Sequence, residues 1–532
     1  MTNELFFRTE DLRLEEVSKY FVETSGDRRI IDAIKGRSAV LLRGSRGVGK
    51  SFLLRVAEAE MKASFETEAV LPVYLTFARA GLIKQDQHNF LPWMTAKITS
   101  SVQRSITSYG LKVPESSALA ALAGTQASQV SEGPTLMERL TSVFEQFWSK
   151  DKPSEDISGA PEPEAIRYAI EDLCDDIGVA RIALLVDEAA HVFIPEQQRQ
   201  FFTLMRDLRS PYLSVKAAVY PGATSYGESF QPTHDAAVLD IERNVVDASY
   251  ANAMREIVFR QDPSRRKDIE QYGEIFDILA FAATGNPRIL LKTLTASTPL
   301  RQNSAQSTIR EYYREEIWAE HSTLAERYPG HRTLIDWGRN FLENEVLPAL
   351  HARNQKETEA SSAIWIHRDA PQVVREALRL LCYSGILQEG TAGIRATRSE
   401  VGTRYMVNVG CNLAQDASPI SYGRRLRGSL DKRRMVEFGA NHGAYRSIQD
   451  FSLQQLEQDG NVALEARLTS PISSLDLTAF LRSKLSELEL STIGEVLNTD
   501  EESFKKLHYV GEVRARQMRN AAHMAVIEYL SG

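Results

Sequence analysis

An eight-residue stretch near the N-terminus has the residue types and spacing of a phosphate-binding loop. It fits the pattern G-x-x-x-x-G-K-[ST] and consists of Gly44, Ser45, Arg46, Gly47, Val48, Gly49, Lys50 and Ser51. Phe52, which follows it directly, is also a candidate for contact with the nucleotide. The glycines let backbone N–H groups turn toward a phosphate at the positive end of a helix. Lys50 would reach the β- and γ-phosphate oxygens, and the Ser51 hydroxyl would be a ligand for Mg²⁺. The pattern therefore predicts a site for ATP with Mg²⁺.

The elements that must position this loop are present on either side of it. Residues 38–42 form an apolar run that predicts a buried strand, and residues 51–61 have the pattern of an amphipathic helix. Strand, glycine loop and helix in this order are the context that the motif requires. A chance glycine turn before a helix is the alternative interpretation, and the context weighs against it.

Two adjacent carboxylates end a second apolar run. Residues 181–188 read Arg-Ile-Ala-Leu-Leu-Val-Asp-Glu, so a buried strand delivers Asp187 and Glu188 at its carboxyl end. Asp187 is placed to hold the Mg²⁺ shell through water, and Glu188 is placed to polarise the water that attacks the γ-phosphate. After a phosphate-binding loop, this Walker B pattern predicts ATP hydrolysis.

His191 follows the two carboxylates at a spacing similar to the D-E-x-H box of superfamily 2 helicases. The spacing is one residue too long, and neither an arginine-rich helicase motif nor a second motor domain is visible in the sequence. We therefore interpret His191 as an ordinary residue near a helix start. A translocating helicase stays the weaker enzyme alternative.

Three more strands are expected beside the first and the acidic strand, at residues 69–77, 214–220 and 236–242. In a parallel sheet the nucleotide lies at the carboxyl edge of the strands. Thr224 follows the strand at 214–220, so we expect its hydroxyl to contact the γ-phosphate.

The N-terminal residues 1–35 lead directly into the first strand, where many nucleotide switches hold the base. Tyr20, Phe21 and Val22 are candidates for contact with adenine. Aromatic residues at helical spacing are more often part of a core, which is the alternative for these three.

The bulk composition is that of a globular protein with several domains. The chain has 532 residues, which predicts three or four domains, and no apolar run reaches the roughly 18 residues of a membrane helix. Three widely spaced cysteines without C-x-x-C spacing predict neither a disulfide framework nor a metal site. We expect a cytoplasmic protein with no membrane partner, because the N-terminus lacks a secretory or transit pattern. The net charge of −8 argues against general coating by nucleic acid but allows local basic patches.

The glycine loop, the Val-Asp-Glu strand and the run Thr-Gly-Asn-Pro-Arg at residues 284–288 resemble AAA+ ATPases. Their order and separation are similar to the origin-recognition and replication-initiator class and to the related STAND signalling ATPases, over roughly residues 1–300. The resemblance implies that Arg288 is a sensor 2 arginine, which reports the γ-phosphate to a helical lid. Residues 221–237 contain no arginine where a finger often sits, which leaves Arg206, Arg209 and Arg243 as unranked substitutes.

Initiator-class ATPases carry a winged helix after the lid, and residues 331–415 have helices followed by two short strand-like runs. Six cations then lie within eleven residues, opposed only by Asp431: Arg424, Arg425, Arg427, Lys432, Arg433 and Arg434. Such a cluster would neutralise several DNA phosphates in a salt-sensitive manner. A solvated linker is the alternative for the cluster, and protein contact is the alternative for the winged helix.

The last 62 residues resemble the C-terminal domain of the bacterial RNA polymerase alpha subunit. The match covers about residues 471–527 and includes Leu-Ser-Thr-Ile-Gly-Glu-Val-Leu and a glycine turn at Gly511. The pattern predicts a helix-hairpin-helix, whose turn offers backbone N–H groups to a DNA phosphate. The expected basic side consists of Lys505, Lys506, Arg514, Arg516 and Arg519. Protein docking by the same fold is the alternative.

The expected fold class is an α/β P-loop NTPase with a parallel, AAA+-like sheet and a helical lid, followed by a winged-helix domain and an all-α helix-hairpin-helix domain. In chain order we expect a base-contacting segment (1–35), an ATPase core (36–250) with insertions at about 110–135 and 149–164, a lid (251–330), a winged-helix-like domain (331–415), a basic linker (416–470) and the helix-hairpin-helix domain (471–532).

The function predicted from the sequence is a slow, Mg²⁺-dependent ATPase that acts as a nucleotide-controlled switch and binds DNA through its C-terminal modules. The alternative is a STAND-type signalling ATPase, for example in an antiviral defence system. That protein would form a homo-oligomer on ATP binding and use the same modules to bind protein partners.

Overall fold

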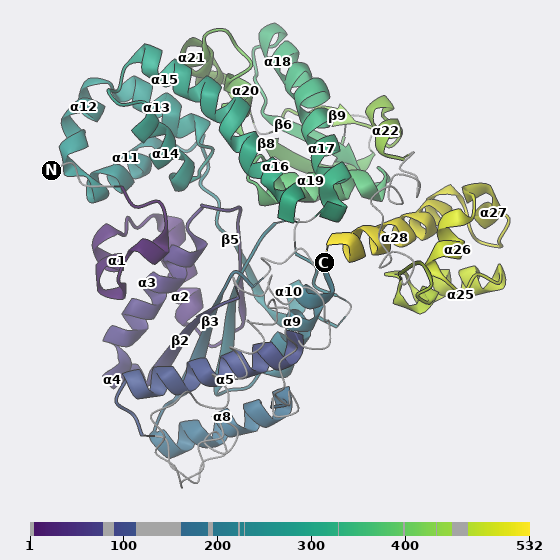
Figure 1. Cartoon of the computed structure of the whole chain (residues 1–532). Coiled ribbons are helices and arrows are strands. Elements are labelled where there is room, and N and C mark those ends of the chain that lie inside the picture. The colour runs from purple at the N-terminus through teal and green to yellow at the C-terminus, as the bar shows by residue number, and fades with distance from the viewer. Residues whose placement is uncertain are drawn as a thin grey trace. The chain divides into compact units, whose positions relative to one another are not determined.

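The computed structural model describes residues 5–77, 90–112, 161–189, 195–221, 224–227, 229–327, 329–396, 400–431, 433–449 and 467–531. The chain divides into two compact units (Figure 1). The first comprises residues 1–220, 224–271 and 285–292, and the second comprises residues 221–223, 272–284 and 293–532. Residues 113–135 and 149–160 of the expected insertions lie outside the described residues, as do His191 and Lys432.

The first unit is built around a parallel five-stranded sheet with the order β2-β3-β4-β1-β5. This arrangement confirms the α/β class and the parallel sheet that the sequence predicts. The strands are β1 (Val40–Arg43), β2 (Val70–Thr76), β3 (Arg181–Asp187), β4 (Leu213–Val219) and β5 (Ala237–Asp240). Because β4 lies between β1 and β3, residues that follow β4 emerge between the glycine loop and the acidic pair.

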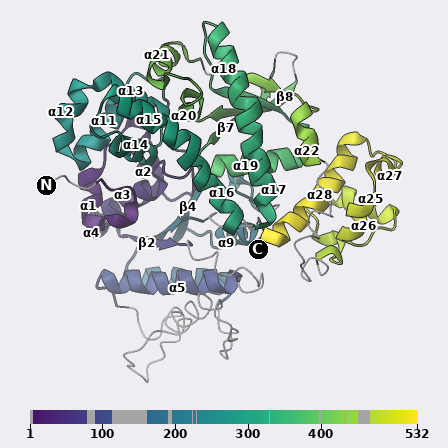
Figure 2. The same ribbon diagram turned by 45° about the horizontal axis from the view of Figure 1, so that its top comes forward.

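The helices of the first unit are α1 (Leu14–Tyr20), α2 (Ser25–Lys35), α3 (Lys50–Ala63), α4 (Phe65–Glu68), α5 (Phe90–Ser108), α8 (Pro163–Ile177), α9 (Pro195–Asp207), α10 (Pro232–Asp235), α11 (Tyr250–Gln261), α12 (Arg266–Gln271) and the beginning of α14 (Pro287–Ala296). Helices α2 and α3 pack on one face of the sheet, and α5 crosses the other face (Figures 1 and 2). Covering both faces explains why β3 and β4 are buried along their whole length. The interior of β3 is accordingly a continuous apolar run, whereas β4 includes the buried polar residues Ser214 and Lys216.

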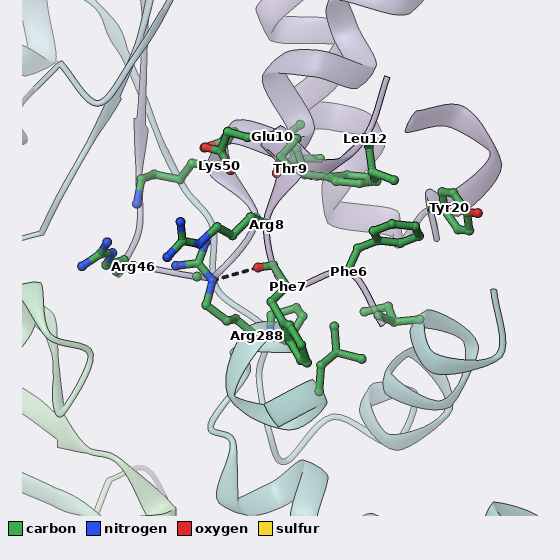
Figure 3. Close-up of a pocket in the computed structure, with 18 of the residues that line it drawn as sticks. Phe6, Phe7, Arg8, Thr9, Glu10, Leu12, Tyr20, Arg46, Lys50 and Arg288 are labelled. Carbon is green, nitrogen blue, oxygen red and sulfur yellow. Dashed lines mark hydrogen bonds between the residues drawn. The ribbon is translucent and has the colours of Figure 1, made fainter. Parts of the chain in front are cut away.

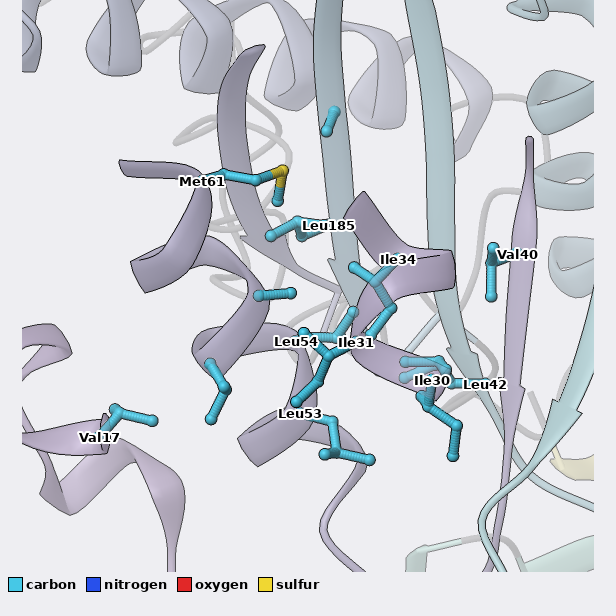
Figure 4. Close-up of a cluster of buried hydrophobic side chains, with 14 of the residues drawn as sticks. Val17, Ile30, Ile31, Ile34, Val40, Leu42, Leu53, Leu54, Met61 and Leu185 are labelled. Atoms are coloured by element: carbon cyan, nitrogen blue, oxygen red, sulfur yellow. The ribbon is translucent and has the colours of Figure 1, made fainter. Parts of the chain in front are cut away.

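The main core on the α2–α3 face follows the two-residue period of the strands. Val40 and Leu42 of β1 and Leu185 of β3 point to this side, where they meet Ile31 of α2 and Leu54 of α3 (Figure 4). All five side chains are at most 1% exposed. This packing fixes the end of β1 against the start of α3, and the glycine loop connects the two.

The second unit contains a mixed four-stranded sheet with the order β7-β8-β6-β9. Its strands are β6 (Ala363–His367), β7 (Leu387–Arg395), β8 (Val401–Val407) and β9 (Val436–Phe438). Strand β8 pairs antiparallel with both β7 and β6, and β9 pairs parallel with β6. The expected two-stranded ribbon is thus part of a larger sheet, and the winged-helix assignment stays a prediction.

The helices beside this sheet are α13 (Gly273–Ala282), α15 (Gln302–Glu311), α16 (Ile317–Arg327), α17 (Arg332–Phe341), α18 (Leu347–Lys356), α19 (Gln372–Tyr383), α20 (Val409–Leu413), α21 (Pro419–Ser429) and α22 (Arg446–Gln449). The chain ends in α25 (Ala479–Glu487), α26 (Ile493–Asn498), α27 (Glu501–Lys505) and α28 (Glu512–Ser531). None of the helices in the described part of the chain is long and apolar enough to span a bilayer.

The four C-terminal helices share an apolar core of their own. Val510, Ala515 and Met518, three apolar positions of the expected helix-hairpin-helix pattern, are buried in it. In the turn before α28, Tyr509 has a φ of 65°, in the left-handed region. A Cβ atom at Gly511 would meet no atom within 4 Å. The helix-hairpin-helix assignment itself stays a prediction.

Candidate nucleotide-binding site

The glycine loop connects the end of β1 to the start of α3, and its glycines are required by its shape. Gly47 and Gly49 have φ values of 87° and 106°, in the left-handed region that favours glycine. Gly44 has no room for a side chain, because a Cβ atom there would lie 2.7 Å from Val48 Cγ2. The glycine spacing predicted from the sequence thus serves backbone geometry and close packing.

The carbonyl groups of the loop are held by side-chain donors. Lys50 Nζ donates to Gly44 O at 2.6 Å and to Ser45 O at 3.0 Å. Asn286 Nδ2 donates to Arg46 O at 2.7 Å, and Arg243 Nη1 donates to Val48 O at 2.6 Å. No side chain caps the N-terminus of α3 among the described residues. The first N–H groups of this helix therefore remain as donors for an anion.

Lys50 is buried at the base of the cavity, with 6% of its surface exposed. Its Nζ lies 3.9 Å from the centroid of the Tyr220 ring. Burial lowers the pKa of Lys50 to about 7, and the charge of Asp187 opposes this shift. Phosphate oxygens placed beside the ammonium would favour its charged form and raise that pKa again.

The acidic pair lies at the carboxyl end of β3, as the sequence predicts. Asp187 accepts a hydrogen bond from the Tyr74 hydroxyl at 2.7 Å and another from the Glu188 backbone N–H at 2.9 Å. Glu188 lines the cavity and has a φ of 54°. Such strained backbone persists only where the surrounding structure enforces it, and it concentrates at functional sites.

Burial raises the pKa of the Glu188 carboxyl, and the neighbouring charge of Asp187 raises it further. A carboxylate with a raised pKa is a better general base than an ordinary surface glutamate. Glu188 therefore combines the location and the chemistry needed to accept a proton from water.

The oxygen donors at this end of the sheet fit Mg²⁺. Ser51 lines the cavity, and Asp187 ends β3, which is separated from β1 by β4 in the sheet. A hydroxyl and a carboxylate are the hard ligands that Mg²⁺ prefers, with phosphate oxygens and water completing an octahedron. Within the described residues, no group of three or more His, Cys, Asp or Glu side chains is placed to hold a metal by itself.

The turn before α14 contacts the glycine loop directly. Gly285, with φ of 79°, donates its N–H to the buried Tyr250 hydroxyl at 3.0 Å. Asn286 then bonds Arg46 O through Nδ2, and its Oδ1 accepts the N–H groups of Arg288 and Ile289 at 3.1 and 3.3 Å. One side chain thus joins the start of α14 to the glycine loop.

Arg288 lines the cavity, and its Nε donates to Phe7 O at 3.0 Å (Figure 3). Burial lowers the pKa of Arg288, and the nearby Arg46 contributes to the lowering. Lys50, Arg46 and Arg288 give this part of the cavity a positive character that suits a polyphosphate.

The other half of the cavity is apolar and comes mainly from the N-terminal segment. Tyr20 and Phe21 line it, and the ring centroid of Phe6 lies 5.4 Å from that of Tyr20 (Figure 3). Val22, Phe7, Leu12, Ile257 and Leu291 line it as well. An apolar compartment beside a cationic one matches the base and the phosphates of a nucleotide.

Most of the predicted nucleotide-site residues meet at this one cavity. Those that line it are Arg46, Gly47, Gly49, Lys50, Ser51, Phe52, Glu188 and Arg288. Thr224 is placed differently, since its hydroxyl donates to Tyr220 O at 2.7 Å and accepts from Tyr220 N–H at 3.2 Å. At the end of β4 it is Tyr220 that lines the cavity.

Arg243 and Asn286 were not assigned to the loop by sequence reasoning, which considered Arg243 only as a substitute arginine finger. The largely buried Arg243 guanidinium instead contacts the glycine loop of its own chain and lies 3.8 Å from Asp27. Arg206, another substitute, bonds Asp207 and Ser229 O. The sequence signals for this role are weak. Arg243 is a polar residue shortly after β5, and Asn286 is a polar residue directly before α14.

The basic residues predicted for DNA lie in the second unit, and carboxylates face many of them. Ion pairs join Arg424 to Glu274, Arg427 to Asp277, Arg434 to Glu359, Lys505 to Glu502, Arg516 to Glu512 and Arg519 to Glu501. Arg514 donates to Tyr509 O. Within the described residues, Arg425, Arg433 and Lys506 have no carboxylate at ion-pair distance.

Comparison with solved structures finds distant likenesses. A Walker-type ATPase of Pyrococcus abyssi has a TM-score of 0.36 and 14% identity, and the match covers 80% of this chain and 100% of that one. The ORC1 protein of Aeropyrum pernix, solved in complex with DNA, has a TM-score of 0.28 and 14% identity over 77% of this chain and 94% of its own. The ORC2 protein of the same organism, solved as ADPNP–ADP complexes, has a TM-score of 0.33 and 11% identity over 80% and 95%. No protein-family model and no curated protein matches the chain, so the interpretation of the site depends on its own geometry.

Proposed function

We propose that the protein is a Mg²⁺-dependent ATPase that acts as a nucleotide-controlled switch. The observation that carries this proposal is the meeting of Lys50, Ser51, Glu188 and Arg288 at one cavity whose other half is apolar. Each of these side chains has a separate task in binding or cleaving a triphosphate. A purely structural glycine turn would not need them together.

The backbone N–H groups at the start of α3 and the Lys50 ammonium would bind the β- and γ-phosphates. Ser51 and Asp187 would hold Mg²⁺, which supplies charge neutralisation on the phosphate oxygens when bound. Glu188 would orient a water molecule for attack on the γ-phosphate and accept its proton. Arg288 would neutralise charge on the γ-phosphate, and it links that phosphate to the N-terminal segment through its bond to Phe7 O.

The apolar half of the cavity is proposed to hold adenine. Tyr20, Phe21 and Phe6 offer aromatic and apolar surface for the base.

The output of the switch is proposed to involve the second unit, with DNA as the first candidate. Exposed ion pairs contribute little stability, so the phosphates of DNA can compete with the carboxylates for their arginines. Arg425, Arg433 and Lys506 are the strongest candidates, because within the described residues none of them has a carboxylate at ion-pair distance. The pairing of the other cations favours the alternative, in which the same surfaces bind protein partners of a signalling ATPase.

Glu188→Gln tests the proposed reaction. The variant should bind ATP with an affinity close to that of the wild type, because glutamine keeps the size of the side chain. Its hydrolysis should fall by at least about a hundredfold, the scale of a lost general base. Glu256→Gln, on the exposed face of α11, is the matched control. Unchanged ATP turnover in the Glu188 variant would contradict the assignment of Glu188 as the general base.

Fluorescence anisotropy with labelled duplex DNA tests the output. Replacing Arg425 and Arg433 by Gln should weaken binding uniformly across sequences and reduce the salt slope by about one per lost phosphate contact. Arg206→Gln is the control in the first unit. If the wild type does not bind DNA at low salt, the protein-binding alternative is favoured.

A further inference from the structure

Tyr220 lies at the point where β4 ends between the glycine loop and the acidic pair. It directly follows Val219, the last residue of β4, and only 4% of its surface is exposed. The Thr224 hydroxyl holds its backbone from both sides, with one hydrogen bond to Tyr220 O and one from Tyr220 N–H. The chain therefore fixes the direction in which this side chain leaves the sheet.

The ring of Tyr220 lies against the ammonium group of Lys50. The 3.9 Å distance from Nζ to the ring centroid is well within the roughly 6 Å range of a cation–π contact. The same ammonium also donates to Gly44 O and Ser45 O. An aromatic face on one side and loop carbonyls on the other determine where the charge of Lys50 sits in the cavity.

We propose that Tyr220 is the positioning residue for Lys50 and thereby sets the affinity of the site for the β- and γ-phosphates. This inference rests on the proposed function, since it assigns a partner to the phosphate-binding lysine. The contact depends on the aromatic ring, whereas the hydroxyl is not needed for it. Thr224 acts one step further away, by holding the backbone of Tyr220.

A packing role for the ring is the competing explanation, and the two explanations differ in what they predict. Loss of packing would change the stability of the protein and the binding of every nucleotide in the same proportion. Loss of the ring contact with Lys50 would weaken the binding of ATP and ADP, whose β-phosphate contacts the lysine. The affinity for AMP, which has no β-phosphate, would be nearly unchanged. The effect would also disappear when Lys50 is absent.

The experiment measures the affinities of ATP, ADP and AMP by calorimetric titration of the full chain. Tyr220→Phe should bind all three like the wild type, because the ring is kept. Tyr220→Leu should bind ATP and ADP about two- to thirty-fold more weakly, the range of cation–π contacts from exposed to desolvated. Thr224→Val, which keeps its shape but loses both hydrogen bonds to Tyr220, should show a smaller loss of the same pattern. Tyr226→Leu, outside the cavity, is the control for loss of an aromatic ring.

A double-mutant cycle with Lys50→Gln completes the test. Tyr220→Leu should cause no further loss of ATP affinity in the Lys50→Gln background. An equal loss in both backgrounds, or an equal loss for AMP and ATP, overturns the inference in favour of packing. If Tyr220→Leu fails to fold, as judged by its melting temperature, Thr224→Val decides between the same outcomes. Failure of the proposed function gives a different result. Either the wild type would not bind ATP, or Lys50→Gln would bind ATP as tightly as the wild type.

Discussion

Asn286 is a buried side chain that bonds both the glycine loop and the start of α14. On the proposed function, replacing it should weaken ATP binding, and the loss should be larger for alanine than for serine. The side chain is 4% exposed. Its Nδ2 bonds Arg46 O, and its Oδ1 accepts the N–H groups of Arg288 and Ile289. Serine would keep a cap for α14 but lose the bond to the loop, and alanine would lose both.

The expected losses follow from these bonds. A hydrogen bond of this kind contributes about 1 kcal/mol, and an N-terminal cap contributes about 1 kcal/mol more. If the loss of these bonds destabilises the binding-competent shape of the loop by the same free energy, the population of that shape falls. The apparent affinity for ATP then falls by the same factor. Asn286→Ser should therefore bind ATP up to about fivefold more weakly, and Asn286→Ala up to about thirtyfold more weakly.

Titration with a fluorescent ATP analogue measures both variants. Asn252→Ser, on the exposed face of α11, is the matched control and should bind like the wild type. Equal affinities of Asn286→Ala and the wild type would refute this role, because the hydrogen bonds of Asn286 would then have no part in shaping the loop. Equal losses for Ser and Ala would assign the whole effect to the bond with Arg46 O.

The pH dependence of ATP binding and the packing of Gly47 provide two more predictions. Burial lowers the pKa of Lys50 to about 7 in the free protein, and bound phosphate should raise it. ATP binding near pH 8 should therefore be accompanied by uptake of a proton by Lys50, and the affinity for ATP should fall as the pH rises. Calorimetry in buffers of different ionisation heat measures the proton uptake. Lys216 is a buried lysine outside the cavity, so Lys216→Met should leave the uptake unchanged. Absence of proton uptake in the wild type would contradict the lowered pKa of Lys50. Gly47→Ala should lower ATP affinity at least about tenfold, because the residue has a φ of 87° and its Cβ would lie 2.7 Å from Asn286 Oδ1. Gly428→Ala, where a Cβ would meet nothing within 4 Å, is its control, and equal affinities of the two variants would contradict the geometry.

The sign of the Lys50 effect on stability follows from the same pKa. The unfolded chain binds this proton up to about pH 10.4, the ordinary value for lysine, whereas the folded chain releases it near 7. The unfolded state thus holds this proton more tightly between these values, and the contribution of Lys50 to stability should rise with pH across that window.

Local patterns in the sequence were sufficient to predict the parts of the site that belong to one continuous stretch. The glycine loop, the strand before it and the helix after it depend on neighbours a few residues apart, and so does the acidic end of β3. Parallel strands place their carboxyl ends at one edge, so the meeting of Lys50 with Glu188 also followed from the pattern. The α/β class is correct for the same reason.

Contacts between segments far apart in the chain were decided only by the tertiary structure. Arg243 and Asn286 lie about 200 residues or more beyond the loop whose carbonyls they hold, and no local period marks such partners. At the end of β4 the sequence favoured Thr224 by its residue type, but backbone geometry turned its hydroxyl to Tyr220 and placed the aromatic ring in the cavity. Sequence alone was enough to predict a triphosphate site, because its motif is local. The fold decided which distant side chains shape it, because only packing brings them within bonding distance.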